Sequence, residues 1–217
     1  HAETEHVVGM LGLSGDPSPV TAYGVYKGLK ACAAHRYGND SLAGKHVGYY
    51  LCEDLAAEGA KLTVTDIDPE RVQRVVDEFG ATAVEPDAIY DVNAEIFAPC
   101  ALGAVVNDDT IDQMRFEIVG GAANNQLGRS AHGVRLHEKG ILYAPDYVIN
   151  AGGLINVYGE LNEWSADRSK RKAGEIYNTL LRIFDRAETD KVSTNAAADR
   201  VVESRILEAR QLQRTYL

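Results

Sequence analysis

Short apolar segments alternate with amphipathic stretches through the middle of the chain. This pattern predicts strands at Lys61–Thr65, Glu95–Ala98, Glu117–Gly121, Ile141–Tyr143 and Tyr147–Ile149. It predicts helices at Pro19–Tyr37, Tyr49–Glu58, Ala131–Lys139, Arg168–Thr189 and Ala196–Leu212, and one that Asp68-Pro69 opens and Gly80 closes. Strands that alternate with helices at this spacing form parallel sheets with crossover helices. We therefore expect an α/β fold with a doubly wound parallel sheet and a C-terminal helical appendage.

The helix expected at Pro19–Tyr37 lacks a clear apolar stripe. Ser18 and Pro19 suit the N-cap and the first helical position. The positions that face inward include Gly24 and Ala31 and follow only a loose helical period. We expect this helix to pack closely against its neighbours through small residues.

Composition narrows the class of protein. The 217 residues carry a formal net charge of −10 without any basic run, which argues against nucleic acid or an anionic membrane as a partner. No apolar run is long enough for a transmembrane helix. The start, HAETEH, has neither a signal-peptide layout nor an initiator Met, so we expect the chain to begin inside a longer one. Three widely spaced cysteines without metal-ligand spacing indicate no metal and a reduced, cytoplasmic compartment.

One segment has most of a dinucleotide-binding signature. Gly48 precedes the helix Tyr49–Glu58, then Gly59 and a strand, and Asp66 lies 18 residues after Gly48 (66 − 48). A carboxylate at this place binds the ribose hydroxyls of a Rossmann-type site and repels a 2′-phosphate, which favours NAD over NADP. An acidic residue after an apolar strand is also common by chance.

The first strand and its glycine turn are missing from this signature. Only His46 stands between Gly44-Lys45 and Val47-Gly48, and a central strand needs about five residues. Without the turn, no row of backbone N–H groups can bind a pyrophosphate. Either the protein has lost its cofactor site, or residues are missing from the sequence at this point.

Several motifs together resemble those of one enzyme family. They are PSPVTAYGVYKG, TDIDPE, APCALG, GAANNQL and YAPDYVINAGG. With them nearly the whole chain is similar to the glutamate/leucine/phenylalanine/valine dehydrogenase family, most of all to its leucine dehydrogenases. The resemblance implies NAD-dependent oxidative deamination of leucine, valine or isoleucine to a 2-oxo acid and ammonia, by a homo-oligomer.

The chain departs from the family in two ways. About eight residues, enough for a strand and the glycine turn, are absent between Lys45 and Gly48, and a few more near Met10–Leu13. The catalytic lysines and aspartate of the family belong to an upstream domain. We thus expect no catalytic residue here and no activity of the chain alone. The expected parts are 1–16 (end of the substrate domain and linker), 17–165 (dinucleotide-binding domain) and 166–217 (C-terminal helices that pack toward the substrate domain).

The resemblance assigns roles that simpler explanations also cover. Thr21 would hold the nicotinamide carboxamide, although it could be an ordinary helix residue. Asn124 would contact the nicotinamide ribose, although Asn-Asn usually forms an Asx turn. Asn150, expected at a strand end, would face the nicotinamide and the substrate amino group, although a plain turn explains it too. Leu180 and Ile183 would line the substrate pocket, although such a pair is usually core.

The remaining expected cofactor contacts are backbone or apolar positions, namely Gly48, Ile67, Cys100, Ala101 and Ala122. Cys100 could equally be a buried structural thiol. His132 and His137 are five apart, which favours satisfied surface or interface residues over ligands. Two alternatives stay open: a phenylalanine- or valine-type dehydrogenase, and a non-enzymatic remnant if the glycine turn is truly deleted.

Overall fold

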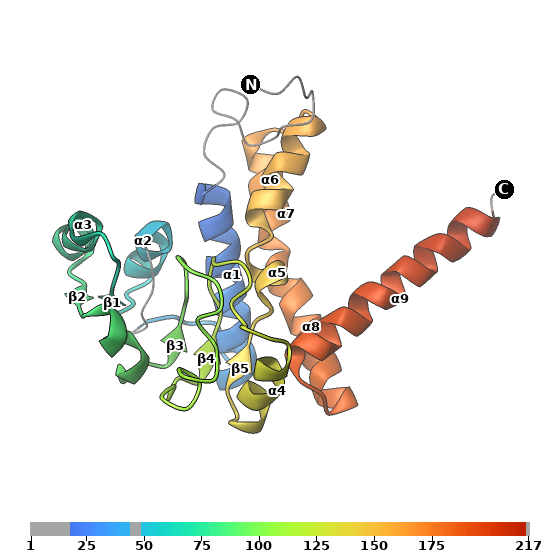
Figure 1. Ribbon diagram of the computed structural model, residues 1–217. Coiled ribbons are helices and arrows are strands. Elements are labelled where there is room, and N and C mark those ends of the chain that lie inside the picture. Colours follow the sequence, from blue (N-terminus) through green and yellow to red (C-terminus); the bar gives the residue numbers. More distant parts are fainter. Residues whose placement is uncertain (1–17, 44–48, 216–217) are drawn as a thin grey trace, which may run out of the picture.

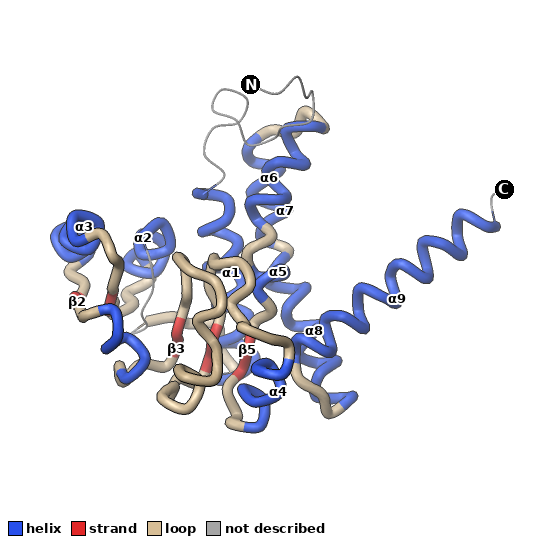
Figure 2. The backbone as a smooth tube through the Cα atoms, in the orientation of Figure 1, coloured by secondary structure: helices blue, strands red, loops and turns tan. Residues whose placement is uncertain are grey.

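The computed structural model describes residues 18–43 and 49–215. Its helices are α1 (Ser18–Tyr37), α2 (Tyr49–Ala57), α3 (Pro69–Phe79), α4 (Ala131–Glu138), α5 (Asp146–Ile149), α6 (Gly152–Leu161), α7 (Ala166–Gly174), α8 (Ile176–Asp190) and α9 (Thr194–Thr215), with a 3-10 helix at Pro86–Asp91. Its strands are β1 (Thr63–Val64), β2 (Thr82–Ala83), β3 (Ile96–Phe97), β4 (Ile118–Val119) and β5 (Leu142–Tyr143). Figure 2 shows how short these strands are beside the loops that continue them. None of the described helices could cross a membrane.

The sheet β3–β4–β5 is parallel and covered on both faces. One rung aligns Ile96, Ile118 and Leu142, and the next aligns Phe97, Val119 and Tyr143. Successive side chains of a strand point to opposite faces. The first rung packs into the core shared with α1 and α8, and the second into a core that Leu136 of α4 completes. The predicted α/β fold with a parallel sheet is confirmed.

The described strands form two separate parallel sheets, β1–β2 and β3–β4–β5 (Figure 1). The usual doubly wound sheet runs in the order third, second, first, fourth, fifth, sixth strand. If a strand before α2 is counted as the first, β1 to β5 correspond to the second to the sixth strand of that order. The sheets β1–β2 and β3–β4–β5 are then the two halves of the doubly wound sheet, on either side of the position of the first strand. Residues 44–48, where the sequence would put the end of that strand, lie outside the described residues, as do residues 1–17.

Helix α1 packs against its neighbours at backbone distance, as its small residues predict. A Cβ on Gly24 would come within 2.8 Å of Ile176 Cδ1. A Cβ on Gly28 would come within 2.9 Å of Ile149 Cδ1 and 3.0 Å of Leu180 Cδ1. Two glycines one turn apart therefore let α5 and α8 approach the axis of α1.

Local capping explains several boundaries that the sequence predicts. The Asp68 carboxylate accepts from Glu70 N–H and begins α3, and Gly80, with φ +66°, ends it. Gly59 and Gly140, with φ +84° and +71°, follow α2 and α4. These positions need the left-handed conformation that glycine adopts without strain.

The strand predicted at Tyr147–Ile149 is wrong, because this segment is the short helix α5. The sheet already ends with β5, and Pro145 turns the chain away from it. The Pro145 carbonyl then accepts from the N–H groups of Val148 and Ile149, which closes a helical turn. Asn150 thus follows a helix and not a strand.

The single helix predicted at Arg168–Thr189 is also wrong, because it is broken after Gly174 into α7 and α8. Glycine is a poor helix former, and the break lets α8 run along α1. Helix α9 begins with Thr194 Oγ1 donating to the Tyr143 carbonyl at 2.6 Å and then projects away from the body (Figure 1).

Substitution Gly28→Ala is expected to destabilise the fold. Overpacking of this kind costs about 1–3 kcal/mol, more than the 0.5–1 kcal/mol or so that alanine adds to a helix. Gly174→Ala is the matched control, since its Cβ would lie an ordinary 3.8 Å from the Tyr23 ring. Thermal melting of the complete protein should rank Gly28→Ala below the unmutated protein and Gly174→Ala at or above it; the reverse order contradicts the packing of α1.

Candidate functional site

The segments that follow β3 and β4 cross at backbone distance. A Cβ on Gly121 would overlap the main chain of Ala98 and Pro99. The Ala123 N–H donates to the Pro99 carbonyl at 2.9 Å. Only glycine fits at position 121, and the crossing fixes the two strand ends beside each other. Ligands of open α/β sheets bind at this end of the strands.

Asn150 joins this crossing from the end of α5. Its Nδ2 donates to Asn124 Oδ1 at 2.7 Å and reaches the carbonyls of Ala122 and Ala123 at 3.3 and 3.4 Å. The structure therefore brings together Ala122, Asn124 and Asn150, which the sequence singled out separately. Because Asn124 Oδ1 accepts, its own Nδ2 is oriented elsewhere and can donate to a ligand.

Thr21 approaches the same region from α1. A Cβ on Gly153 would lie 2.8 Å from Thr21 Oγ1, and one on Gly152 would lie 2.9 Å from Thr21 Cα. These glycines are three and two residues after Asn150, so Thr21 lies beside the start of α6. Glycine at these two positions lets the start of α6 pack directly against α1 beside Thr21, where a side chain would collide.

Asp66 lies two residues beyond β1 and is half-buried. Its Oδ1 accepts from Asp68 N–H at 3.0 Å, so one carboxylate oxygen orders the turn that leads into α3. Ile67, also predicted to contact a cofactor, is 86% exposed. Gly48 lies outside the described residues.

The other predicted site residues differ in their surroundings. Cys100 is exposed, which excludes the buried structural thiol, and Ala101 beside it is exposed as well. Leu180 and Ile183 are buried in the core with α1. Packing alone accounts for this pair, so a role in substrate choice rests on the resemblance only.

Two residues that no predicted role singled out anchor the site, although they stand in the motifs GAANNQL and YAPDYVINAGG. Gln126 is fully buried and donates to the carbonyls of Gly121 and Ala123. Asp146, the first residue of α5, accepts from the N–H of Gln126 at 2.9 Å. Neither belongs to a spacing pattern, because their partners lie 20 residues away or within a loop. Their place within these two motifs was the available signal.

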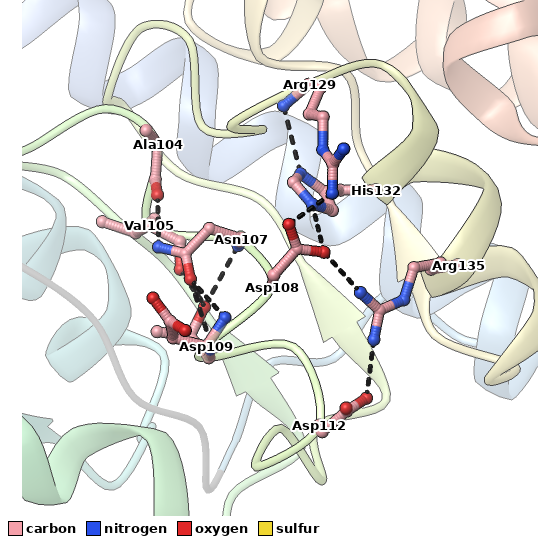
Figure 3. Close-up of polar contacts among 10 residues, drawn as sticks. Ala104, Val105, Asn107, Asp108, Asp109, Asp112, Arg129, His132 and Arg135 are labelled. Atoms are coloured by element: carbon pink, nitrogen blue, oxygen red, sulfur yellow. Dashed lines mark hydrogen bonds and ion pairs between the residues drawn. The ribbon is translucent and has the colours of Figure 1, made fainter.

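An ion-pair network holds the loop 104–112 against α4 (Figure 3). Asp108 accepts from Arg129, from Arg135 at 2.9 Å and from His132 at 3.3 Å. His132 Nδ1 accepts from the Arg129 N–H, so its Nε2 carries the proton toward Asp108. His132 is therefore satisfied as predicted, but it is buried and not on the surface; His137 is exposed.

A cavity of about 190 Å³ lies beyond Asn125, and its lining includes Tyr147, Asn195 and Asp199. Tyr147 donates to Asp199 at 2.8 Å across it, which ties α5 to α9. The cavity is smaller than the sites that enclose drug-sized ligands.

The described site offers amide, hydroxyl and backbone groups on segments that glycines bring close together. Such groups hold and orient a polar ligand, and the residues gathered there include no acid–base pair. The arrangement is thus suited to binding and positioning, with the proton chemistry supplied from elsewhere.

Comparison with known proteins gives a consistent result. Residues 50–215 match the family model of glutamate/leucine/phenylalanine/valine dehydrogenases. The leucine dehydrogenase of Thermoactinomyces intermedius is 52% identical over 228 aligned positions, which take in 100% of this chain and 62% of that protein. The crystal structure of L-tryptophan dehydrogenase from Nostoc punctiforme, 44% identical, superposes with a TM-score of 0.86 over 90% of this chain and 61% of that one. A hetero-hexameric glutamate dehydrogenase from Thermus thermophilus shares the fold at 19% identity, with a TM-score of 0.70. That superposition covers 92% of this chain and 54% of the glutamate dehydrogenase chain. The chain thus spans about 62% of the length of that leucine dehydrogenase.

Asp108→Asn is expected to lower the melting temperature near neutral pH and to have little effect in acid. The hydrogen bond from His132 and the charge of Arg129 hold the pKa of Asp108 below its usual range. Its stabilising contribution is therefore complete above about pH 3.9 and is lost as the pH falls through the lower, folded-state pKa. Asp109→Asn is the control, since that carboxylate has no described polar partner. Equal effects of the two substitutions at neutral pH would show that the network does not stabilise the loop.

The natural protein is expected to contain residues that this sequence lacks. The alignment of 228 positions against 217 residues leaves at least 11 positions (228 − 217) without a residue of this chain. About eight of them, a strand and a turn, should lie between Lys45 and Gly48, and the rest near Met10–Leu13. Sequencing the coding DNA checks this, and a chymotryptic peptide that runs unbroken through Lys45–Gly48 in the natural protein would exclude it.

Proposed function

Because the chain belongs to the glutamate/leucine/phenylalanine/valine dehydrogenase family, we propose that it is the cofactor-binding half of an NAD-dependent amino acid dehydrogenase. The observation that carries the proposal is the hydrogen bond between Asn150 and Asn124 beside the carboxyl ends of parallel strands, with Thr21 packed against the start of α6 that follows Asn150. Three segments far apart in sequence supply these polar groups.

The residues present suit a nicotinamide dinucleotide. The Thr21 hydroxyl, beside the start of α6, would bond to the nicotinamide carboxamide, as the family resemblance implies. The Nδ2 of Asn124, whose direction is set by the hydrogen bond that its Oδ1 accepts, would donate to the adjoining ribose. The backbone of Cys100 and Ala101, together with Ile67 and Asp66, would line the adenosine end, and Gly48 the pyrophosphate. When bound, NAD would supply the hydride acceptor; this chain's residues orient it and exclude water.

For the substrate we propose a branched-chain L-amino acid, oxidised to its 2-oxo acid with release of ammonia. The similarity to leucine dehydrogenase supports it, whereas the likeness to L-tryptophan dehydrogenase supports an aromatic alternative. A phenylalanine- or valine-type dehydrogenase is the other candidate within the family. Asn150 would face the substrate amino group. Leu180 and Ile183 would belong to the helix that forms the wall of the substrate side-chain pocket. A non-enzymatic remnant stays the alternative if the glycine turn is truly deleted.

We propose the same division of the chain as before: the end of a substrate domain and a linker at 1–16, a dinucleotide domain at 17–165 and C-terminal helices at 166–217. The assembly would be a cytoplasmic homo-oligomer. Helix α9 supports this, since Val202, Ile206 and Leu207 are 46–58% exposed on a helix that leaves the body. Exposed apolar side chains on a projecting helix favour a contact with a neighbouring domain or subunit.

The complete polypeptide is expected to reduce NAD with leucine, valine and isoleucine, while this chain alone is inactive. The rate of NADH formation with a panel of amino acids measures this activity. Values of kcat/KM for the branched substrates should exceed those for phenylalanine and tryptophan by on the order of tenfold or more, because one pocket discriminates side chains of different size. A preference for an aromatic substrate would reassign the specificity. Folded full-length protein without turnover of any amino acid would favour the remnant.

The cofactor preference is expected to depend on Asp66. Asp66→Ser combined with Ile67→Arg removes the charge that repels a 2′-phosphate, and serine can still accept from Asp68 N–H. The ratio of kcat/KM for NAD to that for NADP should fall by on the order of tenfold or more. Asp77→Ser, on the exposed side of α3, is the control. An unmutated enzyme that uses NADP as well as NAD would contradict the role of Asp66.

A further inference from the structure

We propose that Gln126 is a positioning residue: its buried carboxamide fixes the loop 121–124 in the conformation that the nucleotide contacts. The nature of the ligand rests on the proposed function, whereas the hold on the loop does not. Gln126 stands in the motif GAANNQL, but the family resemblance assigns no role to it.

The carboxamide of Gln126 is fully buried and its orientation is determined by its partners. Nε2 donates to the Gly121 carbonyl at 2.7 Å and to the Ala123 carbonyl at 3.0 Å. A flipped amide would set Oε1 against both carbonyl oxygens, which is repulsive. The side chain therefore bridges two carbonyls of the loop from within the protein.

The backbone of Gln126 is held just as firmly. Its N–H donates to Asp146 Oδ2 at 2.9 Å, and the other oxygen of Asp146 accepts from Tyr147 N–H at 2.8 Å. The Gln126 carbonyl accepts from Val106 N–H at 3.0 Å. The residue that carries the carboxamide is thus anchored to α5 and to the loop after β3.

The opposite side of the loop faces Asn150, which donates to Ala122, Ala123 and Asn124. The Ala123 carbonyl lies within hydrogen-bond reach of both carboxamides, one on each side. Asn150 is part of the proposed ligand site and would change partners when a ligand binds. Gln126, being buried, keeps its partners and preserves the shape of the loop.

The glutamine is an unfavourable choice for packing alone. Its Oε1 is buried and has no hydrogen-bond partner among the described residues. Such an acceptor destabilises a protein, and an apolar side chain of the same length would avoid the cost. What glutamine adds over methionine here is the pair of donors to the loop. Replacing it by methionine removes the unsatisfied acceptor and also takes a donor from the Gly121 carbonyl. These two effects on stability have opposite signs, so positioning and stability can be separated.

The first test is Gln126→Met in the complete protein. The dissociation constant for NAD, followed by fluorescence titration, should rise on the order of tenfold, while the melting temperature changes little. Gln113→Met is the matched control, because Gln113 Nε2 also donates to a loop carbonyl, that of Asp109 at 2.8 Å, but is exposed and away from the site. Amide hydrogen exchange at Ala123 and Gln126 should accelerate in Gln126→Met only.

The second test is Gln126→Glu, which keeps the shape and makes the donor depend on pH. An ionised carboxylate faces two carbonyls and repels them, whereas a protonated one donates to one of them. The loss of NAD affinity relative to the unmutated protein should therefore be larger at a pH of about 8 than at about 5.5. A residue with only a packing role would show no such dependence.

The outcomes separate the two claims. Unchanged NAD affinity and unchanged exchange in Gln126→Met, or a lower melting temperature with unchanged affinity, would overturn the positioning role. If Gln126→Met does not fold, a pH-independent affinity in Gln126→Glu overturns it instead. An unmutated complete protein that does not bind NAD would refute the proposed function, and the exchange rates would still decide whether Gln126 holds the loop.

Discussion

The structure depends on the close approach of α1 to the helices beside it. Gly24 and Gly28 bring α1 against Ile176, Ile149 and Leu180, and Gly152 lies against the backbone of Thr21. Interiors are packed to the density of organic crystals, so the absence of side chains at these three glycines sets the separation of the helices. The same contacts that build the core thereby carry Thr21 to the ends of the strands.

The loop at the site is held by carboxamides and by the Asp146 carboxylate, and not by ion pairs. Gln126 and Asn150 bond the carbonyls of one loop from opposite sides, and Gly121 presses that loop onto Pro99. Neutral hydrogen bonds of this kind are directional and insensitive to salt. The ion pairs around Asp108 lie on the surface, where solvent weakens them and they hold the loop 104–112.

The separation of the sheet into β1–β2 and β3–β4–β5 agrees with the incomplete sequence signature. The gap between the two sheets and the missing part of the signature both fall at the strand that would come first in a doubly wound sheet. Unpaired strand edges inside a domain cost on the order of 1–3 kcal/mol for each buried group. Against a total stability of about 5–15 kcal/mol, this makes a domain without its central strand hard to sustain.

The sequence by itself determined the fold class, the helices from α1 to α4, and the segments from which the site is built. It could do so because capping residues, glycines and apolar periodicity act locally; Asp68 and Gly80 bound α3 wherever it packs. Only the tertiary structure decided that Tyr147–Ile149 is helical, that α7 and α8 are separate, and that Gln126 and Asp146 anchor the loop. Each of these features depends on partners distant in the chain. The segment of α5 finds the sheet edge already occupied by β5, α8 follows the direction of α1, and Gln126 bonds carbonyls that become buried only on folding.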